Sequence, residues 1–475
     1  MKVLFATPEI APWVKTGGLG DVAGALPPAL RQAGVDLRVL VPYYPALRIA
    51  FPEDKALEVV ALGDFGGTFA DATLRIARTS NGIPLMLLDC PEYYDRDGNP
   101  YLGPDGADWP DNHLRFGLLS RVAAWLGSSA NHLPWRPDIV HCHDWQTGLA
   151  PAYLKLLPDA RARSLITVHN LAFQGLFGPH TLPELALPAH AWGVDGVEFY
   201  GHLSFLKAGL IYADAITTVS PTYAVEIQTD EEGMGMAGLL RHRAEELSGI
   251  INGIDTEVWN PARDAHIPFA YDIDSIAAKK QNKAALQREV GLAVRDDLPL
   301  LGVVSRLTHQ KGLDLIAAIE RQLAALPAQL VVLGNGDKAL EAEFRLLAER
   351  HPGQFAVRIG FNESLAHRIE AGADIFLMPS RFEPCGLNQM YSLRYGTPPV
   401  VRATGGLADT VVDGVNGFVF REASAEALLA AIRRAAASWR DRKAWQAMQI
   451  TGMRSDVGWA KPAAQYAALY GKLAQ

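Results

Sequence analysis

The sequence predicts an α/β protein built from two Rossmann-like, doubly wound domains. Short apolar runs of strand length alternate with helical patterns in both halves of the chain, which is typical of parallel sheets with crossover helices. The hexapeptide Thr-Gly-Gly-Leu-x-Asp also occurs once in each half, at 16–21 and 404–409. Each copy stands between a strand-like and a helix-like run, where glycine N–H groups at a helix N-terminus can bind an anion.

The expected strands form two series, one for each domain. Those of the first half are residues 2–7, 37–42, 85–89, 139–143, 165–168 and 215–219, and those of the second half are 300–304, 330–333, 355–359, 375–378, 399–401 and 417–420. A turn-rich segment at 250–261 separates the two series. We therefore expect domains at 1–250 and 251–456, followed by a terminal helix within 457–475 with helical aromatic spacing.

Composition describes a globular chain with ample core material. Hydrophobic residues make up 49% of the 475 positions and charged residues 20%, so disorder of the bulk is not expected. The sequence has no apolar run of 18 residues and no signal-peptide core. Its three cysteines are widely spaced without a Cys-x-x-Cys pair, which disfavours a disulfide framework or zinc ribbon and leads us to expect a cytoplasmic protein without membrane partners.

The net charge of −8 disfavours a nucleic-acid partner, because such proteins usually carry a basic face. An anionic ligand would instead meet a few placed cations and N–H groups, which favours a small phosphorylated substrate. The oligomeric state is not readable from the sequence.

Three charged residues follow strands of the second half. Arg306 and Lys311 come after the strand at 300–304, and Glu383 lies in the loop after 375–378. Ligands of open parallel sheets bind at the carboxyl ends of the strands, where two cations can neutralise a departing diphosphate. The structural alternatives are solvated cations and, for Glu383, an acid that interacts with a helix dipole.

Polar residues follow two strands of the first half as well. Asp144 and Trp145 end the run at 139–143, and His169 with Asn170 ends the next one. Trp145 is either an apolar platform for a sugar ring or part of the core, and His169 is either a substrate ligand or a structural histidine. The pair His141 and His143 lacks a second pair of ligands at suitable spacing, which disfavours a metal site.

Together these motifs resemble bacterial glycogen synthases and plant starch synthases. They occur in the family's order along essentially the whole chain: Lys15 to Leu19, His143 to Trp145, His169-Asn170, Asn252 to Asp255, Arg306 with Lys311, Ser380 to Leu387, and Thr404 to Asp409. The resemblance implies the GT-B architecture, two Rossmann-like domains facing a deep cleft, with the C-terminal helix crossing back to the first domain. It also implies transfer of glucose from ADP-glucose to the non-reducing end of an α-1,4-glucan, with retention of configuration and without a metal or other cofactor.

The resemblance assigns roles to individual residues. The implied catalytic group is Glu383, Arg306, Lys311, His169 and Asp144; the implied substrate-binding group is Lys15, Gly17, Gly18, Asp21, Trp145, Asn170, Asn252, Phe361, Cys385, Gly386, Leu387, Thr404, Gly405, Gly406, Glu9 and Tyr101. Within it, Phe361 is expected against adenine, and Glu9 and Tyr101 on the acceptor side. Retention through a covalent intermediate and through same-face attack both remain open.

One position separates related branches. Many retaining GT-B enzymes carry a second glutamate eight residues after the first, whereas this chain has Tyr391 there. Glycogen and starch synthases also lack that glutamate, so Tyr391 disfavours membership of the sucrose-phosphate synthase and mannosyltransferase branch. The alternatives that we retain are a sugar-nucleotide epimerase of the same fold and an inactive glucan-binding protein.

Overall fold

The computed structural model describes residues 1–158 and 161–475. The chain folds into two compact units. Unit 1 comprises Met1–Asn252 together with Trp459–Gln475, and unit 2 comprises Gly253–Gly458. The terminal helix α19 thus belongs to unit 1, although it follows unit 2 in the sequence.

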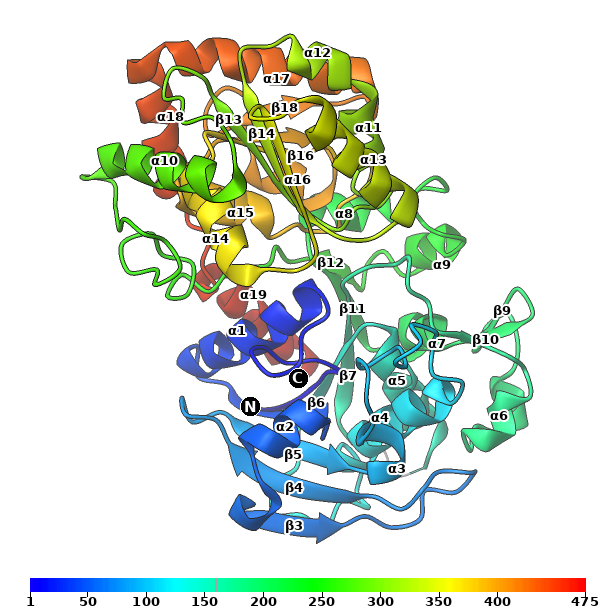
Figure 1. Cartoon of the computed structure of the whole chain (residues 1–475). Coiled ribbons are helices and arrows are strands. Elements are labelled where there is room, and N and C mark those ends of the chain that lie inside the picture. Colours follow the sequence, from blue (N-terminus) through cyan, green and yellow to red (C-terminus); the bar gives the residue numbers. More distant parts are fainter. Residues whose placement is uncertain (159–160) are drawn as a thin grey trace. The chain divides into compact units, whose positions relative to one another are not determined.

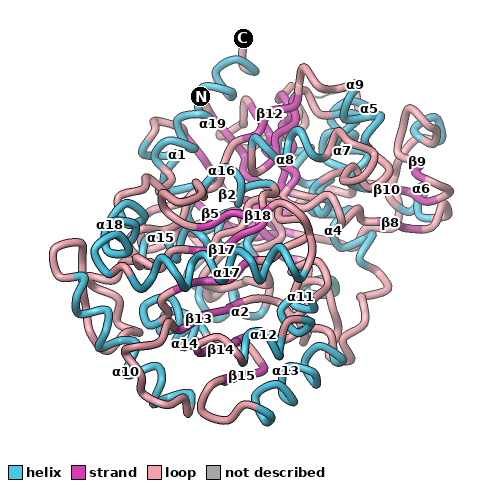
Figure 2. The backbone as a smooth tube through the Cα atoms, turned by 90° about the horizontal axis from the view of Figure 1, so that it is seen from above, coloured by secondary structure: helices cyan, strands magenta, loops and turns pink. Residues whose placement is uncertain are grey.

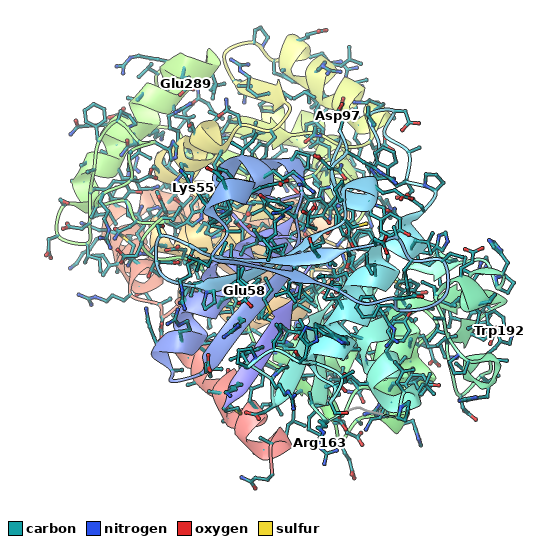
Figure 3. All side chains as sticks on the ribbon, turned by 90° about the horizontal axis from the view of Figure 1, so that it is seen from below. Lys55, Glu58, Asp97, Arg163, Trp192 and Glu289 are labelled. Atoms are coloured by element: carbon teal, nitrogen blue, oxygen red, sulfur yellow. The ribbon has the colours of Figure 1, made fainter. Side chains whose placement is uncertain are left out.

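Unit 1 is organised around a nine-stranded sheet in the order β12-β11-β7-β6-β1-β2-β5-β4-β3 (Figure 1). Its strands are β1 Lys2–Ala6, β2 Asp36–Pro42, β3 Glu58–Ala61, β4 Thr73–Arg78, β5 Pro84–Asp89, β6 Ile139–His143, β7 Arg163–Val168, β11 Ala215–Thr218 and β12 Leu247–Gly249, and a separate small sheet holds β8 Leu176–Phe177, β9 Glu198–Phe199 and β10 His202–Ser204. The strands from β12 to β5 pair in parallel, while β3 and β4 pair antiparallel at one edge. The edge strand β3 carries the exposed Glu58 (Figure 3), a charge of the kind that discourages edge-to-edge pairing.

The helices of unit 1 lie between these strands in the sequence, except for the terminal helix α19. They are α1 Gly18–Gln32, α2 Pro45–Ala50, α3 Pro91–Tyr94, α4 Asn112–Leu126, α5 Leu149–Leu156, α6 Thr181–Glu184, α7 Phe205–Tyr212, α8 Pro221–Glu226, α9 Ala237–His242 and α19 Ala460–Leu473. The terminal helix packs against α1, and its Tyr466 and Tyr470 are buried. Because the two tyrosines are four residues apart, they lie on one helix face and reach the core together.

Unit 2 contains a six-stranded parallel sheet in the order β15-β14-β13-β16-β17-β18. Its strands are β13 Leu300–Val304, β14 Gln329–Gly334, β15 Phe355–Ile359, β16 Ile375–Met378, β17 Pro399–Arg402 and β18 Phe418–Phe420. This is the Rossmann order, in which the direction of winding reverses between the first and fourth strands. The switch point of unit 2 therefore lies between β13 and β16, and the corresponding point of unit 1 lies between β1 and β6.

Helices cover both faces of the unit 2 sheet. They are α10 Lys279–Val290, α11 Leu313–Ala318, α12 Glu320–Ala324, α13 Lys338–Arg350, α14 Glu363–Gly372, α15 Asn388–Arg394, α16 Gly405–Thr410, α17 Ala425–Arg440 and α18 Arg442–Met453. Leu301 and Val303 face a core shared with α11, α13 and α17, whereas Leu300 faces a core shared with α10 and α14. This alternation of side chains along β13 explains the continuous apolar run in its sequence. Figure 2 shows α17 beside β17 and β18.

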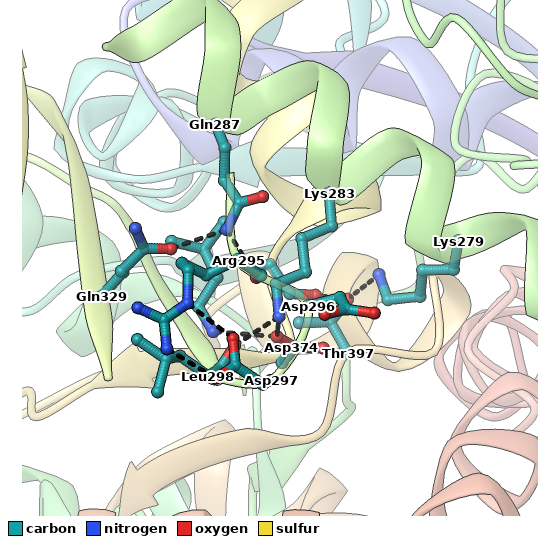
Figure 4. A network of polar contacts seen from close by, with 12 residues as sticks. Lys279, Lys283, Gln287, Arg295, Asp296, Asp297, Leu298, Gln329, Asp374 and Thr397 are labelled. Atoms are coloured by element: carbon teal, nitrogen blue, oxygen red, sulfur yellow. Dashed lines mark hydrogen bonds and ion pairs between the residues drawn. The ribbon is translucent and has the colours of Figure 1, made fainter. Parts of the chain in front are cut away.

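Long polar side chains of α10 attach this helix to the sheet (Figure 4). The Lys279 Nζ donates to the backbone oxygens of Glu370 and Ala371 at 3.0 and 2.8 Å and to the Thr397 hydroxyl at 2.6 Å. One turn later, the Lys283 Nζ lies 2.6 Å from the Asp374 carboxylate. Both lysines are buried, so their hydrogen bonds on this face of α10 are made inside the protein rather than with solvent.

The expected strands agree closely with the observed ones. All twelve expected runs overlap a strand, and four of them match its bounds in full, at β6, β13, β15 and β16. The expected strands pair with one another in parallel, whereas β3 and β4, which the sequence did not indicate, run antiparallel at the edge of unit 1. Within the described ranges, the model contains no helix with the length and apolar character needed to cross a membrane.

Candidate active site

The loops after β13 and β16 meet at the switch point of unit 2. There the Lys311 Nζ lies 2.5 Å from Glu383 Oε2, and the Ser380 hydroxyl donates to the same oxygen at 3.0 Å. Glu383 is only 5% exposed. An ion pair between two such loops places a buried carboxylate and a cation where parallel sheets bind ligands.

Close backbone contacts hold the two loops together. Gly312, directly after Lys311, has φ +68, and a Cβ there would lie 2.0 Å from the Pro379 carbonyl oxygen. The Arg381 guanidinium binds the Asp314 carboxylate through two bonds of 2.6 and 2.7 Å, the bidentate geometry that fixes orientation as well as charge. Only glycine satisfies both the dihedral angle and the contact at position 312.

Arg306 differs from Lys311 in its surroundings. Its side chain is exposed, and no residue in the described parts of the chain forms an ion pair with it. Its full charge thus remains available to an anionic ligand, whereas the charge of Lys311 is already shared with Glu383. The sequence suggested equal roles for these two cations, and the structure distinguishes them.

The second glycine loop packs directly against the Glu383 loop. A Cβ on Gly405, which has φ +43, would lie 1.9 Å from the Glu383 carbonyl oxygen, and one on Gly406 would lie 2.1 Å from that of Cys385. Both glycines and Thr404 are buried. The expectation that each hexapeptide exposes its glycine backbone is therefore wrong for this copy, because its glycines are needed for close packing.

The segment after Glu383 turns sharply into α15. Gly386 has φ +72, and the Gln389 side-chain amide donates to the carbonyl oxygens of Cys385 and Gly386 at 3.1 and 2.9 Å. Leu387 is the last residue before the helix. These contacts fix the backbone on which the predicted sugar-binding residues lie.

Phe361 lies at the carboxyl end of β15. It is 77% exposed and lines a hollow of about 270 Å³ together with Arg358 and Asn362. An exposed aromatic ring beside a hollow suits a flat ring system such as a nucleobase. Its predicted contact with adenine stays a prediction.

In unit 1, hydrogen bonds to Glu9 fix the conformation of the first glycine loop. Its two carboxylate oxygens accept from the Thr16 backbone N–H and the Thr16 hydroxyl, each at 2.6 Å. The Tyr101 hydroxyl also donates to this carboxylate, and Glu9 is 2% exposed. The structure thus gives Glu9 and Tyr101 a role in shaping the loop, in addition to the predicted role near the acceptor.

The first glycine loop itself is open. Gly17 and Gly18 are exposed, a Cβ on Gly17 would have no atom within 4 Å, and no side chain caps the helix that begins at Gly18. The first N–H groups of a helix of this length form an anion site when nothing else binds them. Lys15 lies at the same loop, with its Nζ 2.7 Å from Asp21 Oδ1.

Asp144 ends β6 in a strained conformation. Its φ of 58° and ψ of −171° lie in a region that is nearly restricted to glycine and costs about 1–3 kcal/mol. Its Oδ1 accepts from the backbone N–H groups of His169 and Asn170 at 2.6 and 3.3 Å. Burial raises the pKa of Asp144 to about 7 against the lowering effect of these two amides. Asp144 therefore fixes the loop that carries His169.

The remaining predicted residues of unit 1 have mainly structural contacts. Trp145 packs edge-to-face against Phe116 and Phe205, which supports the core interpretation, and its role as a sugar platform stays a prediction. The Asn170 side-chain oxygen accepts from the Ala172 N–H at 3.0 Å. Asn252 is buried, and its side-chain oxygen has no hydrogen-bond partner among the described residues.

The geometry connects with these sites three residues to which the sequence assigned no role of their own. Ser380 binds Glu383, Thr16 binds Glu9, and Asp314 fixes Arg381. Ser380 and Thr16 belong to the recognised motifs, and this membership was the only signal for them. Ser380 is three residues from Glu383, and Thr16 is seven residues from Glu9. At such spacings the sequence does not distinguish a hydroxyl that binds the carboxylate from an ordinary turn residue. Across the ranges that the structure describes, no group of three histidine, cysteine or acidic side chains is arranged to hold a metal ion.

Comparison with known proteins defines the class as a glycosyltransferase. Residues 2–242 match the family model "Starch synthase catalytic domain", and residues 288–449 match "Glycosyl transferases group 1". The chain is 59% identical to the glycogen synthase of Dechloromonas aromatica, over 99% of this chain and 98% of that protein. It is 52% identical to the glycogen synthase of Nitrosospira multiformis, over 99% and 97%. The chain belongs to the glycogen synthase family.

Solved structures agree with this assignment. The catalytic domain of starch synthase IV from Arabidopsis thaliana, bound to ADP and acarbose, is 30% identical with a TM-score of 0.87 and covers 100% of this chain and 99% of its own. Sucrose-phosphate synthase from Thermosynechococcus elongatus has a TM-score of 0.61 at 18% identity and shows only the shared fold. The predicted GT-B fold and hexosyltransferase class are confirmed.

Proposed function

We propose that this protein lengthens an α-1,4-glucan by transferring glucose from ADP-glucose to the non-reducing 4-hydroxyl, with retention of configuration. The full-length similarity to proteins named glycogen synthase supports the reaction. The similarity to a starch synthase structure that holds ADP and acarbose supports an adenine nucleotide donor and a glucan acceptor.

The ion pair between Lys311 and Glu383 at the switch point of unit 2 carries the proposal. Breaking the glycosidic bond of a nucleotide sugar develops negative charge on the diphosphate and positive charge on the sugar ring. Lys311 and the exposed Arg306 stabilise the negative charge on the diphosphate, and the buried carboxylate of Glu383 stabilises the positive charge on the sugar ring. Cations fixed by the fold can supply this charge compensation, so we propose that the reaction needs no metal cofactor.

In unit 1, the expected contacts with the donor are the open N–H groups at Gly17 and Gly18 together with Lys15. The expected sugar contacts are His169 and the loop that Asp144 fixes. We also propose a cytoplasmic location, which is supported by three widely spaced cysteines without a Cys-x-x-Cys pair.

The test is release of nucleotide diphosphate by the purified protein from ADP-glucose or UDP-glucose, with and without glycogen. We expect ADP release that depends on glycogen, with the UDP-glucose reaction slower. Absence of glycogen-dependent release from both donors would contradict the synthase proposal. Conversion of the donor to an isomeric sugar nucleotide without glycogen would indicate an epimerase, and glycogen binding without turnover would indicate an inactive glucan-binding protein.

A further inference from the structure

Two histidines of β6 connect the terminal helix α19 with His169. His141 and His143 are two residues apart, so their side chains share one face of the strand, and their ring centroids lie 4.1 Å apart. Both are fully buried. The Tyr470 hydroxyl of α19 lies 2.7 Å from His141 Nδ1, and His143 Nδ1 lies 2.9 Å from His169 Nε2.

His141 is held on both sides. Its Nε2 lies 2.6 Å from the Thr167 hydroxyl of β7, while its Nδ1 binds Tyr470. His143 also packs on Phe5 of β1, with ring centroids 3.9 Å apart, and the same phenylalanine lies 5.5 Å from His141. The three rings thus form one buried cluster, and neither histidine ring can turn without breaking a buried contact.

The hydrogen-bond partners of His143 determine where its proton lies. Its Nε2 is buried and has no hydrogen-bond partner within the described parts of the chain. A buried N–H without an acceptor is rarer and more costly than a bare acceptor, so the proton lies on Nδ1 and is donated to His169. Burial lowers the pKa of His169 to about 3, so this ring is neutral near pH 7 and carries its one proton on Nδ1.

We propose that His143 is a positioning residue that fixes His169 as the Nδ1–H tautomer, and that Tyr470 stabilises this arrangement through His141. His169 Nδ1 has no hydrogen bond to any described residue, and it therefore offers an N–H donor to a ligand. An oxygen acceptor, namely a hydroxyl oxygen of the bound sugar, matches this donor. The sugar ligand depends on the proposed function, whereas the tautomer does not.

The tautomer is measured by two-dimensional NMR of protein labelled with ¹⁵N at histidine, which distinguishes protonated from bare ring nitrogens. The His169→Gln variant identifies the signals. We expect His169 with a protonated Nδ1 and a bare Nε2 at pH 7.5, and a mixture of tautomers in His143→Leu. A protonated Nε2 of His169 in the unaltered chain would overturn the proposal. This measurement needs no turnover, so its result is independent of the synthase assignment.

Kinetics test the positioning role. We expect His143→Leu to lower kcat roughly tenfold with little change in the KM for the acceptor, and His143→Gln, which keeps an N–H donor, to recover most of the rate. Tyr470→Phe removes only the hydroxyl, and Tyr466→Phe is its matched control, since that ring lies 5.4 Å from His141 on the same helix. We expect a lower kcat for Tyr470→Phe alone. Equal effects of the two tyrosine variants, or no recovery in His143→Gln, would show that these side chains only pack.

Discussion

At the scale of single residues, Glu383 combines burial with two directed donors. Lys311 and Ser380 both bind its Oε2, which leaves Oε1 as the oxygen available to a ligand. A carboxylate fixed in this way needs no reorganisation when positive charge develops on the sugar ring. Its contribution should therefore appear in the transition state rather than in donor binding.

The variant Glu383→Gln keeps the size of the side chain and removes its charge. We expect kcat to fall by about 100-fold or more, with the KM for ADP-glucose changed far less, because the lost interaction acts mainly in the transition state. Steady-state ADP release with glycogen measures both constants. Glu320→Gln is the control, since Glu320 also forms an ion pair in unit 2, with Arg350, away from the switch point. Near-normal kcat in Glu383→Gln would refute its catalytic role.

Lys311 contributes to stability through its ion pair with Glu383, whereas Arg306 forms no such pair with a described residue. In Lys311→Met the buried carboxylate of Glu383 loses its ion pair, which should cost about 2–3 kcal/mol, less than for a sealed pair because the Lys311 side chain keeps 18% exposure. Arg306→Ala should leave stability unchanged and weaken donor binding. Thermal unfolding and donor titration measure the two effects.

The double variant Lys311→Met, Glu383→Gln is the control for the loss of stability expected in Lys311→Met. Removing the charge of Glu383 removes the penalty of leaving it unpaired, so the double variant should be more stable than Lys311→Met alone. Equal or lower stability of the double variant would show that the ion pair does not account for the loss.

At the scale of elements, the two copies of one hexapeptide have opposite environments. Gly17 is exposed with extended backbone at φ −164, a conformation open to any residue. Gly405 occupies the same place in the second copy but has a positive φ and touches the Glu383 loop. The same sequence thus forms an open helix N-terminus in unit 1 and a packing contact in unit 2.

A pair of alanine variants tests this contrast. We expect Gly405→Ala to lower the midpoint of thermal unfolding by several degrees and to abolish turnover, since its Cβ collides with backbone that cannot move away. Gly17→Ala should keep the midpoint of the unaltered chain while weakening donor binding. Equal midpoints for the two variants would contradict the packing role of the second copy.

The network on α10 predicts a pH dependence of stability. Burial lowers the pKa of Lys279 to about 7 from its ordinary 10.5. Between these values the unfolded chain binds a proton that the folded chain does not, so this residue makes stability rise as pH increases from 7 to 10.5. Lys279→Met should lack that rise. Urea unfolding of both chains at pH 7 and 9.5 measures the difference, and parallel stability curves would contradict it.

The sequence predicted the elements of both sheets because buried parallel strands are continuous apolar runs. It missed β3 and β4, whose exposed positions interrupt the apolar pattern, and the strands of two or three residues, β8, β9, β10 and β12. It also grouped the site residues by motif, but it could not separate Arg306 from Lys311 or the open glycine loop from the packed one. The first difference depends on the contact of Lys311 with Glu383, which are 72 residues apart in the sequence. The second depends on the contact of Gly405 with the Glu383 loop.

At the scale of the whole molecule, the buried groups of unit 1 determine how this part of the chain responds to acid. Unit 1 encloses three imidazoles of lowered pKa, and burial is the main cause at His141, His143 and His169. Asp144, with a pKa raised to about 7, acts in the opposite direction, since its folded form takes up a proton as the pH falls. Three imidazoles outweigh one carboxyl group, so unfolding of unit 1 takes up protons below about pH 6.5.

Unit 1 should therefore lose stability on acidification. The imidazole contribution is fully present above pH 6.5 and is lost below it, at about 1.4 kcal/mol per pH unit for each net proton bound on unfolding. Hydrogen exchange of the β6 and β7 amides in urea, between pH 6.5 and 5, measures the free energy of opening. His143→Gln has one buried imidazole fewer, so its stability should fall less steeply with acid, whereas His190→Gln, which removes an exposed imidazole, should match the unaltered chain. Equal slopes in all three chains would show that the buried histidines do not control the acid stability of unit 1.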